Sequence, residues 1–192
     1  SEGDPIALAE KRTVAFERIR KILYISTPLV EQTSRIKLLF ESGDQRYFYV
    51  PCRHCGHYQV LRWSQMKFEK DEKGNLAWDS VFYECEKCAG PWKNADKVWF
   101  LPRGEWRATE KPSEPGIRSY HISSLYSPVG MQSWESICQE WLRAQGDQAR
   151  LRTFINTILG EPWKVRGEAP GWEGLMIRRE NYALGDVPRQ AE

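Results

Sequence analysis

The chain has 192 residues, enough for one mid-sized domain or two small ones, and its nine Trp, eight Tyr and seven Phe supply ample apolar material for a core. Its 28 basic and 26 acidic residues leave a formal net charge of only +2, so charge gives no argument for a nucleic-acid partner. No apolar run reaches the roughly 18 residues that a membrane span needs, and no signal peptide is visible. We therefore expect no membrane partner and a reducing compartment.

The first 50 residues predict a short α/β segment. Asp4 can cap a helix whose first residue is Pro5 and which runs to about Phe16. A second helix is predicted to begin after Ser34 and to end at Gly43, since Ile36, Leu38, Leu39 and Phe40 supply its apolar side chains. Residues 45–51 predict a strand that leads into the first cysteine pair. The chain opens at Ser1 rather than Met, and we expect residues 1–50 to be the end of a larger sheet domain.

Between these two helices, residues 21–28 place four apolar residues in a row before Ser26, Thr27 and Pro28. This pattern predicts a buried parallel strand with polar groups at its carboxyl end. In open α/β sheets that end faces the ligand crevice. The alternative is an ordinary buried strand that Ser26 and Thr27 merely cap.

Two Cys-x2-Cys pairs are the most specific feature of the sequence: Cys52 with Cys55, and Cys85 with Cys88. Such pairs can close a tetrahedral four-thiolate site, for which zinc is the default metal and iron the rarer one. Two disulfides, two redox motifs and chance spacing are the alternatives. We predict zinc, because nothing marks the chain as secreted and a redox motif would need only one pair.

The residues between the two pairs predict an antiparallel hairpin, so the pattern as a whole predicts a zinc ribbon. Residues 58–63 and 76–83 are its expected strands, and Gly74-Asn75 is its turn signal. His54 and His57 lie beside the site and are expected to be neighbours of the metal rather than ligands. Cys138 stands alone on a predicted helix, where we expect it to serve packing. Basic side chains near the pairs are candidates for contacts with DNA phosphates, although a solvated surface is the simpler interpretation: Arg53, Arg62, Lys87 and Lys93.

After the second pair, residues 117–128 predict a strand in which His121 is expected to be a core or surface residue. Ser133 and Asp147 then cap two amphipathic helices joined near Gly146, the second of which ends at Gly160, and these should form an antiparallel hairpin. The remaining residues, 161–192, are rich in Gly and Pro and predict a linker.

These elements predict an α+β fold in four parts. Residues 1–50 are expected to be the C-terminal remnant of an ATPase α/β domain and 51–101 the zinc ribbon. Residues 102–160 are expected to form a strand plus helical-hairpin bridge, followed by the linker. The assignment of the first part to an ATPase comes from the resemblance described next.

Several separated stretches resemble the large terminase subunit of lambda-type tailed bacteriophages, and they keep the order of that family's motifs over nearly all 192 residues. They are 2–5 with the following helix, 21–28, 44–56, 120–128, the helix at Trp134, and 154–163. One departure lies in the second Cys-x2-Cys turn, or knuckle, where Ala89 stands at a position that is often Gly in zinc-binding turns. Gly90 is expected to provide the flexible glycine of this turn instead.

The resemblance implies a DNA-packaging motor in which an ATPase drives duplex DNA into a capsid and a metal-dependent nuclease cuts the concatemer. It implies ATP and Mg in the intact parent, with the phosphate loop before Ser1 and the nuclease carboxylates after Glu192. This chain would then lack both catalytic centres and be inactive alone, although the family is enzymatic. Ser26 and Thr27 resemble the family's coupling motif, whose hydroxyls can exchange partners on nucleotide hydrolysis.

The partners that the resemblance implies for the parent are double-stranded DNA, the small terminase subunit and the portal, in the host cytoplasm. A homo-oligomer is compatible with it. The rival hypothesis from another class is a free-standing zinc-ribbon module that binds nucleic acid and has no motor.

Overall fold

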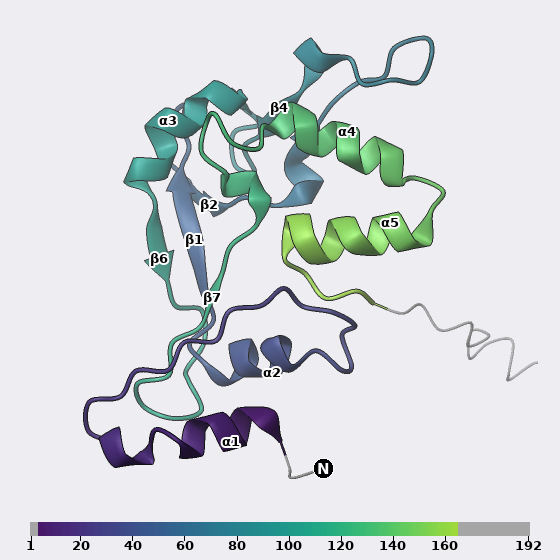
Figure 1. The fold of residues 1–192 in the computed structure, drawn as a ribbon. Helices are drawn as coiled ribbons and strands as arrows, with labels where there is room; N and C mark the ends of the chain where they lie inside the picture. Colours follow the sequence, from purple (N-terminus) through teal and green to yellow (C-terminus); the bar gives the residue numbers. More distant parts are fainter. Residues whose placement is uncertain (1–3, 165–192) are drawn as a thin grey trace, which may run out of the picture.

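A computed structural model describes residues 4–164, which form an α+β fold with two small, mainly antiparallel sheets (Figure 1). The first sheet has the order β2-β1-β6, with β7 also pairing with β1, and the second has the order β3-β4-β5. The strands are β1 (Arg46–Pro51), β2 (Tyr58–Val60), β3 (Met66–Lys67), β4 (Phe82–Glu84), β5 (Pro91–Trp92), β6 (Glu105–Arg107) and β7 (Tyr120–His121). The helices are α1 (Pro5–Lys11), α2 (Arg35–Ser42), α3 (Lys97–Phe100), α4 (Trp134–Ala144) and α5 (Gln148–Thr153). None of the helices described is long and apolar enough to span a bilayer.

Both predicted N-terminal helices are present, and their starts follow the sequence signals. The Asp4 side chain accepts a hydrogen bond from the Ile6 N–H at the start of α1. This helix is shorter than predicted, and a 3-10 turn at Val14–Phe16 follows it. Helix α2 begins after Ser34 and stops at Gly43, as predicted.

The predicted buried strand at 21–28 is wrong for this structure. The segment is extended but pairs with no strand among residues 4–164, and the side chains of Leu23 and Ile25 are 79% and 85% exposed. A strand needs a neighbour to satisfy its backbone N–H and C=O groups, and no strand lies alongside this segment. Within residues 4–164, the nearest β-bridge to a distant part of the chain lies just beyond the segment, between Val30 and Trp163.

The predicted hairpin between the cysteine pairs is present, but its first strand is not the expected one. β3 pairs with β4 around the turn at 71–75, whereas residues 58–60 pair with β1. β2 pairs with β1, and β4 pairs with β3 and β5, all antiparallel. Each cysteine pair therefore occupies the turn of its own short hairpin, 52–57 between β1 and β2 and 85–90 between β4 and β5. The intervening turn is present, since Asp71 accepts hydrogen bonds from the N–H groups of Lys73 and Asn75.

The predicted strand over 117–128 is reduced to β7, which pairs in parallel with the start of β1. A 3-10 turn then buries Tyr126, whose hydroxyl donates to the Phe48 carbonyl at 2.6 Å and accepts from the Leu61 N–H at 2.7 Å. This side chain links β1 to the chain beyond β2.

The core lies between the second sheet and the C-terminal helices, and aromatic rings fill it. Trp134, at the start of α4, packs against Tyr83 of β4 at 5.7 Å and Phe100 of α3 at 6.1 Å between ring centroids. Helices α4 and α5 lie side by side in Figure 1, and Trp141 contacts Phe154 between them at 5.1 Å. Helix α5 continues as a π-helix, Phe154–Leu159, which ends at Gly160 in the left-handed conformation. Cys138 is fully buried in this core. Of the predicted linker 161–192, residues 165–192 lie outside the described part.

Candidate metal centre

The four predicted ligands Cys52, Cys55, Cys85 and Cys88 meet in one place. Their sulfurs all lie within 4.8 Å of one another. The Sγ atoms of Cys52 and Cys88 are 3.8 Å apart, and those of Cys55 and Cys85 are 3.9 Å apart. A tetrahedral zinc ion with Zn–S bonds of about 2.3 Å places its sulfurs roughly 3.8 Å from one another. These separations fit a four-thiolate metal site and are far too long for S–S bonds of about 2.05 Å.

The two Cys-x2-Cys turns, or knuckles, are held by the same pattern of backbone hydrogen bonds. In the first, the Cys52 N–H donates to the carbonyl oxygen of His57 at 2.8 Å, and the Gly56 N–H donates to that of Cys52 at 2.8 Å. In the second, the Cys85 N–H donates to the carbonyl oxygen of Gly90 at 3.1 Å, and the Ala89 N–H donates to the carbonyl oxygen of Cys85 at 3.0 Å. The repeat explains why two sequence-distant turns present their sulfurs alike.

The fourth residue after each first cysteine takes a left-handed backbone conformation, with φ of 70° at Gly56 and 54° at Ala89. The expectation that Gly90 would replace the usual glycine is therefore wrong, because Ala89 itself adopts the turn conformation. Gly90 is needed for a different reason, which is lack of space: a Cβ there would lie 2.8 Å from His54 Cδ2 and 3.2 Å from Cys88 Sγ. The second knuckle thus carries local strain that the first avoids.

The first cysteine of each pair is buried, and the second is exposed. Burial alone would raise the pKa of the Cys52 thiol, but the backbone N–H groups of Cys55 and His54 lower the pKa to about 7. Burial dominates at Cys85 and raises the pKa of its thiol to about 12. Without a cation, the thiolate form is therefore favoured at Cys52 and disfavoured at Cys85. A divalent ion would favour the thiolate form of all four.

Side chains next to the cysteines tie the two knuckles together. His54 Nε2 lies 3.0 Å from the Pro91 carbonyl oxygen, and His57 Nε2 lies 2.9 Å from Glu86 Oε1, so both rings serve cross-knuckle contacts. Gln59 is fully buried, and its Oε1 accepts from the Glu86 N–H at 2.9 Å. Sequence reasoning missed Gln59 and Glu86. The sequence signal that could have indicated Gln59 was its place on the inward face of a predicted strand.

The four basic side chains proposed for DNA contact are exposed, but two of them already have protein partners. Arg53 forms an ion pair with Asp96 at 3.2 Å. The Lys93 Nζ donates to the carbonyl oxygens of Asp79 and Val81 at 2.9 and 3.1 Å. The other two are Arg62 and Lys87.

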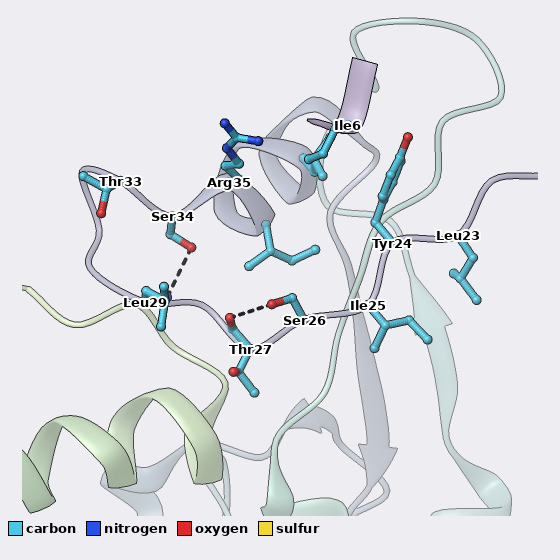
Figure 2. A pocket seen from close by; sticks show the side chains of 12 residues that line it. Ile6, Leu23, Tyr24, Ile25, Ser26, Thr27, Leu29, Thr33, Ser34 and Arg35 are labelled. Atoms are coloured by element: carbon cyan, nitrogen blue, oxygen red, sulfur yellow. Dashed lines mark hydrogen bonds between the residues drawn. The ribbon is translucent and has the colours of Figure 1, made fainter. Parts of the chain in front are cut away.

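Ser26 and Thr27 lie far from the cysteines along the chain, on the extended segment that passes α2 (Figure 2). Both side chains are exposed and line two neighbouring cavities of about 670 and 710 Å³. The Ser26 hydroxyl donates to the Thr27 carbonyl oxygen at 3.0 Å, and across the cavity Ser34 Oγ accepts from the Leu29 N–H at 3.3 Å. Leucine and isoleucine side chains form the apolar wall.

Comparison with known protein families gives two matches that together cover most of the chain. The model for the phage terminase large subunit gpA, ATPase domain, matches residues 1–106. The model for the terminase large subunit gpA, endonuclease domain, matches residues 117–192. The interval between the two matches, residues 107–116, begins at the last residue of β6 and otherwise lies in the loop that leads to β7.

Two curated relatives are similar over almost the whole chain. The large terminase subunit of Escherichia phage lambda is 31% identical over 209 aligned residues, which cover 95% of this chain and 31% of the relative. The large terminase subunit of Enterobacteria phage P21 is 32% identical over 209 residues, covering 94% of this chain and 30% of the relative. The chain thus spans about a third of the length of these relatives, and no solved structure matches it. By its family match and these similarities, the chain belongs to the gpA family of phage terminase large subunits.

Proposed function

We propose that this chain is a central segment of a phage DNA-packaging motor and that Cys52, Cys55, Cys85 and Cys88 hold one structural zinc ion within it. The observation that carries the zinc proposal is the pair of cross-knuckle Sγ–Sγ separations, 3.8 and 3.9 Å, which fit tetrahedral coordination. All four positions would be filled by thiolates, which leaves no open position for a substrate or water. The ion therefore joins two hairpins, and the site has the features of a zinc ribbon.

The amount of structure that depends on the ion supports a structural role. Each hairpin is short, with three and two paired positions respectively, so neither is expected to be stable alone. Structural zinc sites contribute about 10–16 kcal/mol to folding in small domains. Zinc removal should loosen both sheets together.

The motor role rests on family membership. In the intact parent we propose ATP-driven DNA translocation and concatemer cleavage, with ATP and Mg bound by parts of the longer protein. The proposed partners are double-stranded DNA, the small terminase subunit, the portal and further copies of the same subunit, in the host cytoplasm. Arg62 and Lys87 are the better DNA-contact candidates in this segment, because Arg53 and Lys93 already have protein partners.

Ser26 and Thr27 are proposed to couple nucleotide state to DNA movement. The support is their position: two exposed hydroxyls at the end of an extended segment, facing cavities large enough to admit another part of the longer protein. In the full-length parent, the double variant Ser26→Ala, Thr27→Ala should bind ATP but lose translocation. Normal packaging by that variant would remove the coupling proposal.

The zinc proposal is tested on the purified chain by metal analysis and thiol titration of the wild type, Cys85→Ser and Cys138→Ser. We expect one zinc per chain for the wild type and Cys138→Ser, and loss of zinc with a large fall in melting temperature for Cys85→Ser. Equal melting temperatures with and without chelator would argue against a structural ion, and iron in place of zinc would correct the metal.

A DNA-binding titration at two salt concentrations separates the motor segment from the rival free-standing nucleic-acid-binding module. The module predicts tight, salt-sensitive binding by this chain alone. A motor segment predicts weak binding, because most of the DNA path would belong to the rest of the parent.

A further inference from the structure

The segment that carries Ser26 and Thr27 is held in place with little apolar burial. Neither α1 nor α2 has a buried residue, whereas the hydrophobic core cluster runs from Val50 to Leu159. Within residues 4–164, no backbone N–H from Lys21 to Thr27 donates to a protein acceptor. Contacts other than core packing therefore fix where this segment and α2 lie.

Ser119 is the first such contact, and each of its polar groups bonds the turn between α2 and β1. Its hydroxyl donates to the Phe40 carbonyl oxygen at 2.7 Å and accepts from the Gln45 N–H at 2.9 Å. Its N–H donates to Asp44 Oδ1 at 3.2 Å, and its carbonyl oxygen accepts from the Arg46 N–H at 2.8 Å. Ser119 is only 9% exposed, so water competes little for these bonds.

The turn that Ser119 holds is strained. Gln45 has φ of 48°, a left-handed conformation that is uncommon for residues other than Gly. Ser119 can approach the turn because Gly43 has no side chain: a Cβ there would lie 2.6 Å from Ser119 Cβ. A strained conformation persists only where its surroundings hold it, so loss of the Ser119 hydroxyl should let α2 move relative to β1.

Trp163 is the second contact, and it acts through its backbone. Its N–H donates to the Leu29 carbonyl oxygen at 2.8 Å, and its carbonyl oxygen accepts from the Glu31 N–H at 3.0 Å. These bonds form the parallel bridge opposite Val30. Leu29 lies two residues after Thr27 (Figure 2), so the bridge fixes the chain just beyond the two hydroxyls.

Ser119 and Trp163 both lie in the part of the chain that matches the endonuclease model, whereas every residue that they hold lies in the part that matches the ATPase model. We propose that Ser119 and Trp163 are positioning residues for the proposed coupling segment, so that the endonuclease-matching region sets the place of Ser26 and Thr27. This inference rests on the coupling role proposed above.

Amide hydrogen exchange on the zinc-loaded 192-residue chain tests the Ser119 contact. Ser119→Ala should raise the exchange rate of the Gln45 N–H about tenfold. Ser113→Ala is the matched control: its hydroxyl donates to the Ser42 carbonyl oxygen at 2.9 Å, but its own N–H donates to the same oxygen at 2.8 Å. Gln45 should therefore exchange at the wild-type rate in the control. Equal Gln45 rates in the two variants would overturn the Ser119 contact.

The Trp163 contact has a matched pair of its own. Trp163→Pro removes the N–H that donates to Leu29, whereas Trp163→Ala keeps it. Only Trp163→Pro should speed exchange of the Glu31 N–H, again by about tenfold. The same Glu31 rate in both variants would show that the bridge does not hold the segment.

The functional test uses the full-length parent and measures the DNA packaged per ATP hydrolysed. A protein that is merely destabilised loses hydrolysis and packaging together, whereas a displaced coupling segment lowers the DNA packaged per ATP. We expect Ser119→Ala and Trp163→Pro to lower this ratio several-fold, with Ser113→Ala and Trp163→Ala near the wild type.

The outcomes separate this inference from the proposal on which it rests. If the double variant Ser26→Ala, Thr27→Ala loses translocation but both Ser119→Ala and Trp163→Pro keep the wild-type ratio, the positioning role is overturned and the coupling role stands. If the double variant packages normally, both are overturned. If Ser119→Ala does not fold, the two Trp163 variants still decide.

Discussion

Lys97 is completely buried at the start of α3, and replacing it with Met should stabilise the protein. Its Nζ lies 5.0 Å from the centre of the Trp134 ring and 3.5 Å from the Gln132 carbonyl oxygen, a long hydrogen bond. Burial lowers the pKa of this amine from 10.5 to about 8, although the charge of Glu135 opposes the shift. At neutral pH the protein therefore keeps a poorly solvated cation in its core.

The size of the effect follows from that pKa. Lowering it from 10.5 to about 8 corresponds to about 3 kcal/mol of destabilisation at pH 7, since each pH unit is worth about 1.4 kcal/mol. Lys97→Met removes the charge and keeps an unbranched stem. It also loses the cation–π contact with Trp134, worth about 0.5–2 kcal/mol. We expect a net gain of about 1–3 kcal/mol in the free energy of unfolding at pH 7.

The sign of the pH dependence gives a sharper test than the gain alone. Between about pH 8 and 10.5 the folded wild type releases the Lys97 proton while the unfolded chain keeps it, so wild-type stability should rise with pH in that window. The advantage of Lys97→Met should shrink over the same range. Urea unfolding of zinc-loaded protein at pH 7, 8, 9 and 10 measures this, with Lys73→Met in the exposed turn as the control. A variant less stable than the wild type at pH 7, or a difference that does not change with pH, would refute the reasoning.

Four further substitutions test single features. Ala89→Gly should stabilise the metal-loaded protein by up to about 1 kcal/mol because Ala89 has φ of 54°, whereas Gly90→Ala should speed metal loss. Denaturant unfolding measures the first effect and chelator kinetics the second. If Ala89→Gly is destabilising, the second knuckle does not carry the strain inferred for it. Asp44→Asn should cost about 1–3 kcal/mol at pH 7: burial alone would raise the pKa of Asp44, but hydrogen bonds from Arg46 and the Ser119 N–H hold it below its usual value. That difference should fade as the pH drops through the folded-state pKa of Asp44, where the wild-type carboxylate is protonated, and a constant difference in acid unfolding curves would contradict it. Cys138→Ala should lower stability by about 1 kcal/mol through lost packing and leave zinc content unchanged, so a loss of zinc would show an unexpected link to the metal centre.

Local signals predicted local structure well. Asp4, Ser133 and Asp147 each cap the helix expected of them, because a cap depends only on residues two or three positions away. The strand that enters the first knuckle is present as β1, and the spacing of the four cysteines was enough to predict that their sulfurs meet.

Pairing between distant segments could not be predicted in the same way. Residues 58–63 and 76–83 were expected to pair with each other. Instead β2 pairs with β1 across the first knuckle, while β4 pairs with β5 across the second knuckle and with β3. The backbone hydrogen bonds of the knuckles decide this, since they turn the chain straight back on itself. The segment 21–28 has the composition of a buried strand but lies extended and partly exposed, because composition cannot supply a neighbouring strand.

The side chains around the cysteines were the hardest to foresee. Gln59 and Trp92 occupy equivalent positions in two hairpins whose sequences are otherwise unlike, and the relationship is visible only once the knuckles are aligned. Ala89 shows the opposite case: sequence reasoning marked the departure from glycine but moved the turn conformation to the wrong residue.

X-ray absorption at the zinc edge, on the purified chain with its metal content measured in parallel, tests the central claim most directly. One zinc per chain surrounded by four sulfurs at about 2.3 Å is the expected result. A folded chain that carries no metal and shows Cys52, Cys55, Cys85 and Cys88 as free thiols, or a zinc ion bound by nitrogen or oxygen in place of any of them, would contradict it.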